Sequence, residues 1–224
     1  MIKAIICDVD GTLLDSERIY MKAWKMAGKE LGYDVTDEVL MKTRAMNVKD
    51  ATVIFETMIG NGFSYEKTRV GRVRIAEELI EKESPILKDG VKEFIELAQK
   101  KGLRLAVASS TGKQKTIDHL RRNGILDPFE VIVGGDMITN GKPAPDIFLK
   151  AAELLGVEPE YCAVLEDSVS GIRAAAAAKM VPIQIPDVVP ANDETRSLSY
   201  AVVDSLLDIE SVLDRLSGEA SDGK

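Results

Sequence analysis

Two carboxylates stand two positions apart, directly after an apolar run near the start of the chain. The run covers residues 2–7, and the acids are Asp8 and Asp10. In open α/β sheets, ligands bind outside the carboxyl ends of the strands. Acids placed there can converge on one site, where one can act as a nucleophile and the other can transfer protons. Gly11 lets the backbone turn tightly and bring its amides near an anion. The plainer alternative is a pair of solvated acids at a strand end.

Hydroxyl groups follow a second apolar run, residues 103–108. Ser109, Ser110 and Thr111 come directly after it. A hydroxyl at a strand end can donate a hydrogen bond to a phosphoryl oxygen. Because serine and threonine are also preferred N-caps, capping of the next helix is the simpler interpretation of Ser109 taken alone.

A lysine and two further acids complete the set. Lys142 lies in GKPAPD, residues 141–146, where two prolines restrict the backbone and present one cation on a stiff loop. Glu166 and Asp167 follow a third apolar run, residues 163–165. Carboxylate oxygens are ligands that Mg²⁺ prefers, and it is usually held by only one or two of them. A solvated lysine and a helix-capping Asp167 are the alternatives.

These positions require a parallel sheet to bring them together. Apolar β-rich runs alternate with helical patterns, which is typical of an α/β fold with helices on both faces of the sheet. We predict strands over residues 2–7, 103–108, 131–133, 163–165, 181–185 and, as a sixth candidate, 200–203. We predict helices over residues 91–101, 113–123, 146–155 and 168–179. Since parallel strands end at one edge, the acids, the strand-end hydroxyl of Ser109 and the lysine should meet there.

Residues 16–84 interrupt this alternation. The segment is rich in Lys, Glu, Met and Leu, has turn signals but no convincing strand, and therefore predicts a helical insert. We expect a discontinuous core of residues 1–15 and 85–224, with residues 16–84 forming a helical cap. Trp24 and Met26, on the first cap helix, are expected in the core of the cap.

Composition restricts the possible partners. A net charge of -8 argues against a broad phosphate-backbone footprint, so we expect no nucleic-acid partner. Cys7 and Cys162 cannot form the disulfide framework of a small secreted domain. No run approaches the roughly 18 apolar residues of a membrane-spanning helix. We expect a cytoplasmic protein without membrane contact that acts as a monomer.

The motifs, in this order, resemble the four motifs of the haloacid dehalogenase superfamily. They are DVDGT at 8–12, the strand-end Ser109, GKPAPDIF at 141–148 and LEDS at 165–168. The resemblance covers essentially the whole chain, and the helical insert is similar to that of the branch containing phosphoglycolate phosphatases and β-phosphoglucomutases. It implies a Rossmann-like three-layer core, an inserted α-helical cap, a bound Mg²⁺ and an aspartyl-phosphate intermediate.

The resemblance also implies roles for individual residues. The catalytic residues it implies are Asp8 as nucleophile, Asp10 as general acid and base, Ser109 and Lys142. The Mg²⁺ ligands are expected to be Asp8, Asp10, Glu166 and Asp167. The substrate-binding residues are expected to be Val9, Gly11, Ser110, Tyr20 and Arg44.

Specificity is expected to come from the cap, because loops and lids decide specificity on a reused fold. Tyr20 follows the first motif by about two turns of helix, which makes it the first cap residue to consider. The cap cations considered as candidates to face the cleft are Arg44, Lys49, Arg69, Arg72 and Arg74. Most of them should be solvated, as is usual for charges on a helix rich in Lys, Arg and Glu.

The activity predicted is Mg²⁺-dependent hydrolysis of a small phosphate monoester, a sugar phosphate or similar metabolite. An acid at position 10 favours phosphate esters over the substrates of the superfamily's dehalogenases. A sugar phosphomutase is the alternative, but β-phosphoglucomutases characteristically carry a histidine shortly after the first motif. The corresponding stretch of this chain, residues 15–24, has Tyr20 instead, and the only histidine is His119. A non-enzymatic phosphoacceptor module is a more distant alternative, because it gives no reason for the cap.

Overall fold

The chain divides into two compact units, a core and a cap. The residues described by the computed structural model are 1–43, 48–60, 62–84 and 86–218. The core comprises Met1–Leu14 and Leu87–Lys224, and the cap comprises Asp15–Ile86. Leu14 and Leu87 form an antiparallel bridge where the chain leaves the core and returns to it.

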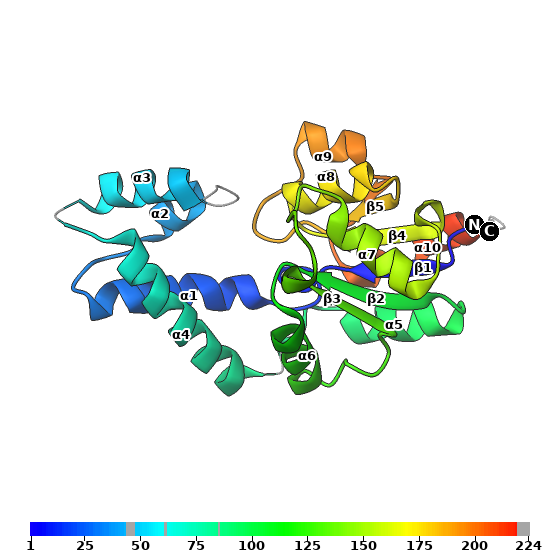
Figure 1. Cartoon of the computed structure of the whole chain (residues 1–224), viewed down its shortest axis with the longest axis horizontal. Helices are drawn as coiled ribbons and strands as arrows, with labels where there is room; N and C mark the ends of the chain where they lie inside the picture. The colour runs from blue at the N-terminus through cyan, green and yellow to red at the C-terminus, as the bar shows by residue number, and fades with distance from the viewer. Residues whose placement is uncertain (44–47, 61, 85, 219–224) are drawn as a thin grey trace. The chain divides into compact units, whose positions relative to one another are not determined.

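The core is built on a parallel sheet with the strand order β3-β2-β1-β4-β5-β6 (Figure 1). Its strands are β1 (Ala4–Cys7), β2 (Arg104–Ser109), β3 (Val131–Gly134), β4 (Cys162–Glu166), β5 (Val181–Gln184) and β6 (Ala201–Val202). The central strands β1 and β4 are buried along their whole length, as expected for apolar strands with helices on both faces. The predicted α/β class and the sixth strand are confirmed.

Helices cover both faces of this sheet. The core helices are α5 (Val91–Lys100), α6 (Lys113–Arg122), α7 (Asp146–Leu155), α8 (Val169–Ala177), α9 (Asp193–Leu198) and α10 (Glu210–Ser217), with short 3₁₀ turns η1 (Gly135–Met137), η2 (Pro159–Tyr161) and η3 (Leu206–Asp208). Phe148 of α7 and Ala175 of α8 join Ile6 and Ala108 in one buried cluster. α5 packs on β2 from the opposite face (Figure 1). No helix among the described residues is both long and apolar enough to cross a membrane.

Some element ends differ from the predicted ones. β1 begins at Ala4 rather than at residue 2, because its pairing with both neighbouring strands starts there. α8 begins at Val169, because Ser168 caps the helix by accepting the backbone N–H of Gly171 at 3.0 Å. It ends at Ala177, shortly before Lys179 takes a φ of 58° in the left-handed region.

The cap is wholly helical in its described residues. Its helices are α1 (Ser16–Glu30), α2 (Asp37–Lys42), α3 (Val48–Ile59) and α4 (Tyr65–Glu83). The Trp24 ring lies 4.7 Å from the ring of Phe55 and 5.3 Å from that of Tyr65, so its predicted place in the cap core is confirmed. The same prediction for Met26 is wrong, since Met26 is 40% exposed. Residues two positions apart on a helix do not share a face.

Candidate active site

The sheet register brings predicted site residues to one edge. Cys7, the last residue of β1, pairs with Val107 of β2 and with Leu165 of β4. Asp8 and Glu166 therefore follow side by side, and the Asp8 N–H donates to the Leu165 carbonyl at 3.0 Å. The strand order reverses between β1 and β4, which is where open α/β sheets form a ligand crevice.

Gly11 allows the tight turn expected after β1. Its φ is 89°, a left-handed conformation that glycine adopts without steric cost. Its N–H donates to the carbonyl of Leu14 at 2.9 Å. A Cβ atom at this position would lie 2.5 Å from Oδ2 of Asp167. Glycine is thus required both by the backbone and by the acid beside it.

Lys142 lies at the centre of the site. Its Nζ atom is 2.5 Å from Oδ1 of Asp8 and 2.6 Å from Oε1 of Glu166. The exposed fractions of these three side chains are 6%, 8% and 1%. The ammonium group also lies 5.0 Å from the centre of the Phe148 ring. A solvated surface lysine is therefore excluded.

Burial and the neighbouring charges shift the ionisation of this cluster. Burial raises the pKa of Asp8 to about 7, with Glu166 acting in the same direction and Lys142 opposing both. Burial alone would lower the pKa of Lys142, but the carboxylates of Asp8 and Glu166 outweigh it and raise that pKa above its usual value. Lys142 therefore stays protonated, and the charge of Asp8 responds to pH near neutrality.

Both oxygens of Glu166 have donors from the chain. Oε1 accepts from Lys142, and Oε2 accepts from the backbone N–H of Ser168 at 2.6 Å and from its hydroxyl at 2.8 Å. A Cβ atom on Gly171 would lie 1.9 Å from the carboxylate carbon of Glu166. Gly171 thus makes room for this acid, a role that the helix pattern alone did not reveal.

Three carboxylates are close enough to hold one cation. Oxygen atoms of Asp8, Glu166 and Asp167 all lie within 4.8 Å of one another in the described part of the chain. A site of carboxylate oxygens without nitrogen or sulfur donors fits Mg²⁺. Asp10 was expected in this group but is not a member of it. Its carboxylate instead accepts a hydrogen bond from the Thr111 hydroxyl at 3.1 Å.

The hydroxyl-rich loop after β2 lies at the same edge of the sheet. Ser109 is only 1% exposed, and its Oγ accepts the backbone N–H of Thr111 at 3.1 Å. Ser109 therefore closes its own loop rather than capping α6, whose N-cap position is occupied by Gly112. Ser110 is exposed. Thr111 was not predicted as a site residue, and the only sequence signal for it is a third consecutive hydroxyl at a strand end.

A small cavity of about 100 Å³ in the cap has aromatic walls. Tyr20, Trp24 and Leu40 line it, and Arg72 lies with its guanidinium carbon 4.3 Å from the centre of the Tyr20 ring. A guanidinium in this position is attracted to the electron-rich face of the aromatic ring. The Nε atom of Arg72 is buried and has no hydrogen-bond partner among the residues that the structure describes. The other predicted substrate-binding residue of the cap, Arg44, lies outside the described residues.

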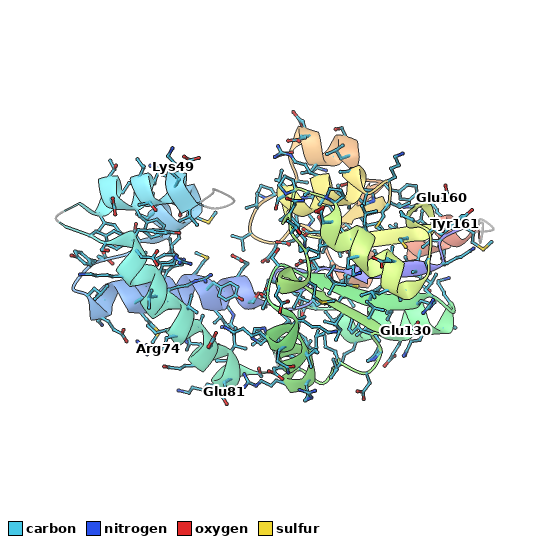
Figure 2. The ribbon with its side chains drawn as sticks, viewed as in Figure 1. Lys49, Arg74, Glu81, Glu130, Glu160 and Tyr161 are labelled. Atoms are coloured by element: carbon cyan, nitrogen blue, oxygen red, sulfur yellow. The ribbon has the colours of Figure 1, made fainter. Side chains whose placement is uncertain are left out.

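Other cap cations are solvated, as expected. Arg69 pairs with Glu66 at 3.1 Å and Arg74 with Glu30 at 2.7 Å, all with side chains at least 44% exposed. Lys49 is exposed, and Figure 2 shows Lys49 and Arg74 extending away from the cap helices.

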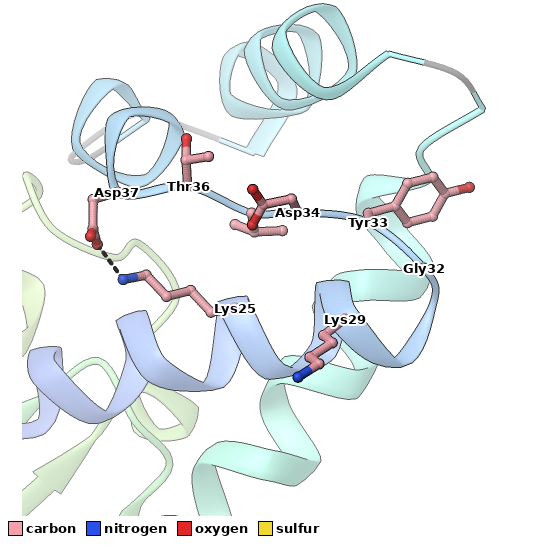
Figure 3. Close-up of a pocket in the computed structure, with 8 residues that line it drawn as sticks. Lys25, Lys29, Gly32, Tyr33, Asp34, Thr36 and Asp37 are labelled. Carbon is pink, nitrogen blue, oxygen red and sulfur yellow. Dashed lines mark ion pairs between the residues drawn. The ribbon is translucent and has the colours of Figure 1, made fainter.

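A larger and more open cavity of about 740 Å³ lies beside the α1–α2 connection. It is lined by Lys25, Lys29, Gly32, Tyr33, Asp34, Val35, Thr36 and Asp37. Across it Lys25 and Asp37 form an ion pair at 2.7 Å, with side chains 44% and 64% exposed (Figure 3). The pairing and the solvation of these charges make it a poor site for an anion.

The fold and the site together define the class of protein. A family model described as haloacid dehalogenase-like hydrolase matches residues 2–179. The chain belongs to this family of hydrolases.

Particular relatives are similar to the chain over most of their length. The phosphorylated carbohydrates phosphatase of Thermotoga maritima is 33% identical over 96% of this chain and 98% of its own. The beta-phosphoglucomutase of Bacillus subtilis is 29% identical over 82% of this chain and 83% of its own. The crystal structure of CbbY from Rhodobacter sphaeroides in complex with phosphate superposes with a TM-score of 0.75, at 28% identity, and covers 93% of this chain and 96% of that one.

Proposed function

We propose that the protein is a Mg²⁺-dependent phosphatase that hydrolyses a small phosphate monoester of the sugar phosphate kind. The observation that carries this proposal is Lys142, buried between Asp8 and Glu166. A desolvated, preorganised cation beside a strand-end carboxylate can offset the charge of a phosphoryl group that this carboxylate attacks. The similarity to a phosphatase of phosphorylated carbohydrates supports the same substrate class.

The proposed metal ligands are Asp8 and Asp167. Glu166 is assigned to holding Lys142 at the rim of the metal site, because its oxygens already accept from Lys142 and Ser168. Gly11 supports this assignment, since its missing side chain leaves room for the Asp167 carboxylate. When bound, Mg²⁺ would offset the negative charge of the phosphoryl oxygens and of the nucleophile.

Asp8 is the proposed nucleophile. One carboxylate oxygen forms a bond to phosphorus while the bond from phosphorus to the ester oxygen breaks, which gives an aspartyl phosphate and an alkoxide. The attack requires an ionised carboxylate. Lys142 favours that form, because its charge opposes the rise in the pKa of Asp8 that burial causes.

Asp10 is the proposed general acid and base. It gives its proton to the departing alkoxide and then, as a carboxylate, takes a proton from the water that attacks phosphorus. The bond from phosphorus to Asp8 then breaks, releasing inorganic phosphate and restoring the nucleophile. Because the Ser109 hydroxyl accepts from the Thr111 N–H, its own proton remains available for a phosphoryl oxygen.

The remaining phosphate contacts are proposed from the loops. The backbone N–H group of Val9 faces the anion in this proposal, and Gly11 contributes the turn after β1 that brings the anion close, since its own N–H already donates to Leu14. Ser110 is assigned the same role from the exposed side of the neighbouring loop.

Substrate choice is proposed to depend on the cap cavity. Tyr20 offers an apolar ring face, and Arg72 offers charge and a buried donor that has no partner within the described part of the chain. That combination suits the hydroxyl groups or a second anionic group of a carbohydrate. Arg44 remains a proposed substrate-binding residue.

A phosphomutase is the second candidate, and the similarity to a beta-phosphoglucomutase favours it. The mutases that the sequence resembles carry a histidine shortly after the first motif, whereas the corresponding stretch here, at the start of α1, has Tyr20. The single histidine of this chain, His119, lies on α6 of the core. We therefore favour hydrolysis.

The test is phosphate release from a panel of monoesters, with Mg²⁺ and with EDTA. The panel includes hexose 6-phosphates, phosphoglycolate and β-glucose 1-phosphate, each also checked for an isomerised product. We expect Mg²⁺-dependent release that Asp8→Asn abolishes. Glucose 6-phosphate formed without free phosphate would identify a mutase, and no turnover would leave a phosphoacceptor module. The cytoplasmic location and the monomeric state remain predictions, the second to be checked by gel filtration.

A further inference from the structure

Thr111 connects the loop after β2 to the loop after β1. Its hydroxyl donates to Oδ2 of Asp10 at 3.1 Å, across 101 positions of sequence. We propose that Thr111 is a positioning residue that holds the Asp10 carboxylate in the orientation needed for proton transfer. This inference rests on the proposed function, in which Asp10 is the general acid and base.

The backbone of Thr111 is fixed on both sides. Its N–H donates to Oγ of Ser109 at 3.1 Å, and its carbonyl accepts the N–H of Gly135 at 3.0 Å and the hydroxyl of Thr116 at 3.4 Å. Threonine is β-branched, so few side-chain rotamers are open to it. The position of the hydroxyl that donates to Asp10 is therefore restricted by both the backbone and the side-chain rotamer of Thr111.

The sequence is adapted to seat this loop against the end of β3. A Cβ atom at Gly135 would lie 2.3 Å from the carbonyl oxygen of Ser110, and one at Gly134 would lie 2.0 Å from the backbone nitrogen of Lys113. Asp136 then accepts the N–H of Lys113 at 2.8 Å, which satisfies a free donor at the start of α6. Two consecutive glycines and one acid thus fix the loop that carries Thr111.

A fixed donor on one oxygen of Asp10 has a chemical consequence. The carboxyl group has two oxygens, and a donor fixed on one of them sets the direction in which the other can exchange a proton with the substrate. General acid catalysis depends on this oxygen lying within hydrogen-bond reach of the leaving group. Removal of the Thr111 hydroxyl keeps the acid but loosens its orientation. The loss of kcat/KM should therefore be larger for esters whose leaving group is more basic and depends more on protonation.

Phenyl phosphate and p-nitrophenyl phosphate are esters of similar size whose leaving groups differ in how much they need a proton. Phenol resembles the tyrosine side chain, with a pKa of about 10, and leaves poorly as an anion, whereas p-nitrophenolate is a far weaker base. For Thr111→Val we expect kcat/KM to fall about tenfold or more on phenyl phosphate and less than about threefold on p-nitrophenyl phosphate. Thr111→Ser keeps the hydroxyl and should restore the phenyl phosphate activity.

The matched control is Thr57→Val, which makes the same chemical change at an exposed position of α3. It should leave both activities unchanged. An equal loss on the two esters in Thr111→Val, or no loss on either, overturns the positioning role. If circular dichroism shows that Thr111→Val does not fold, Thr111→Ala is read by the same criterion.

Asp10→Asn separates this inference from the proposed function. It should lose far more kcat/KM on phenyl phosphate than on p-nitrophenyl phosphate. An equal loss in Asp10→Asn contradicts the acid role and with it the proposed mechanism. A selective loss in Asp10→Asn without one in the Thr111 variants contradicts only the role of Thr111.

Discussion

The Nζ atom of Lys142 and the Oε1 atom of Glu166 lie 2.6 Å apart, with 6% and 1% of their side chains exposed. Oδ1 of Asp8 lies 2.5 Å from the same Nζ atom, so one buried cation forms ion pairs with two buried carboxylates. Removing one member of a buried ion pair leaves an uncompensated charge and costs far more than loss of a surface pair. In the proposed mechanism, catalysis and stability therefore depend on the same three side chains.

Lys142→Met should impair both properties. We expect kcat to fall by about 10²- to 10³-fold, since the preorganised charge beside Asp8 is lost. The free energy of unfolding should fall by about 3 kcal/mol, measured by urea denaturation in EDTA. Lys150→Met is the control, because Lys150 is 35% exposed on α7 and pairs with Glu153 at 3.0 Å. An unaltered rate in Lys142→Met would make the buried lysine purely structural.

The metal-free protein should become less stable as the pH rises from about 4 to about 7. Burial raises the pKa of Asp8 from 3.8 to about 7, so in this window the folded state binds a proton that the unfolded state has lost. The stabilisation that Asp8 provides in this way is complete at pH values below its pKa in the unfolded chain and vanishes above its pKa in the folded protein. It amounts to at most about 4 kcal/mol. Denaturation of Asp8→Asn in EDTA should lack this part of the pH dependence, whereas Asp127→Asn, at an exposed site, should retain it. Identical slopes in Asp8→Asn and the wild type would contradict the raised pKa.

Gly171→Ala should be strongly destabilising, although a Gly→Ala change inside a helix is usually neutral or stabilising. The new methyl group would lie 1.9 Å from the carboxylate carbon of Glu166, so the acid or the helix must move. We expect a loss of about 3 kcal/mol, at the upper end of overpacking, together with a lower kcat. Gly71→Ala is the matched control on α4, where the new methyl would meet the Cβ of Ala27 at 3.4 Å. It should be neutral or stabilise by about 0.5–1 kcal/mol. Thermal unfolding that affects both variants alike would rule out the proposed contact.

Arg72→Ala should change substrate preference rather than the chemistry. The loss of a buried donor and charge should raise KM for the preferred sugar phosphate about tenfold or more. The kcat/KM for p-nitrophenyl phosphate should stay within about threefold. Arg69→Ala removes a solvated guanidinium paired with Glu66 and should alter neither value. Equal effects on the two esters would assign Arg72 to the stability of the cap instead.

Neither cysteine should react with a thiol reagent in the folded protein at pH 8. Cys7 and Cys162 are free and fully buried. Burial raises the pKa of Cys162 to about 11 and raises that of Cys7 well above its usual value, so little reactive thiolate forms. Titration with Ellman's reagent should find both thiols in denaturant and almost none without it. Rapid modification of the native protein would show that β1 or β4 opens easily.

The strand-end residues were predictable because their local pattern is strong. Buried parallel strands are continuous apolar runs, and polar residues at the ends of such runs must lie at the edge of the sheet. Asp8 and Glu166 follow this rule. Thr111 does not follow from it, because its bond to Asp10 depends on how two loops 101 positions apart are packed. Gly171 was equally hidden, since a small residue in a helix indicates close packing but not what packs there.

Cap residues were harder to predict for a different reason. Trp24 and Met26 are both apolar, yet one packs among aromatic rings and the other is 40% exposed. The same applies to the cations, where Arg72 lies over an aromatic ring while Arg69 is paired at the surface. Helix periodicity separates two faces, but only the partner helix decides which face is buried.

The bridge between Leu14 and Leu87 has a consequence for how such an enzyme can change. Just beyond it, the N–H of Asp15 donates to the carbonyl of Ile86 at 2.8 Å. The segment that leaves the core and the segment that returns to it therefore run side by side. A segment whose two ends adjoin can be replaced by one of another length at little entropic cost, because loop closure depends only weakly on length. One recombination event spanning residues 15–86 could therefore transplant a new substrate preference onto an unchanged reaction centre, and a laboratory chimaera could be spliced at the same two points.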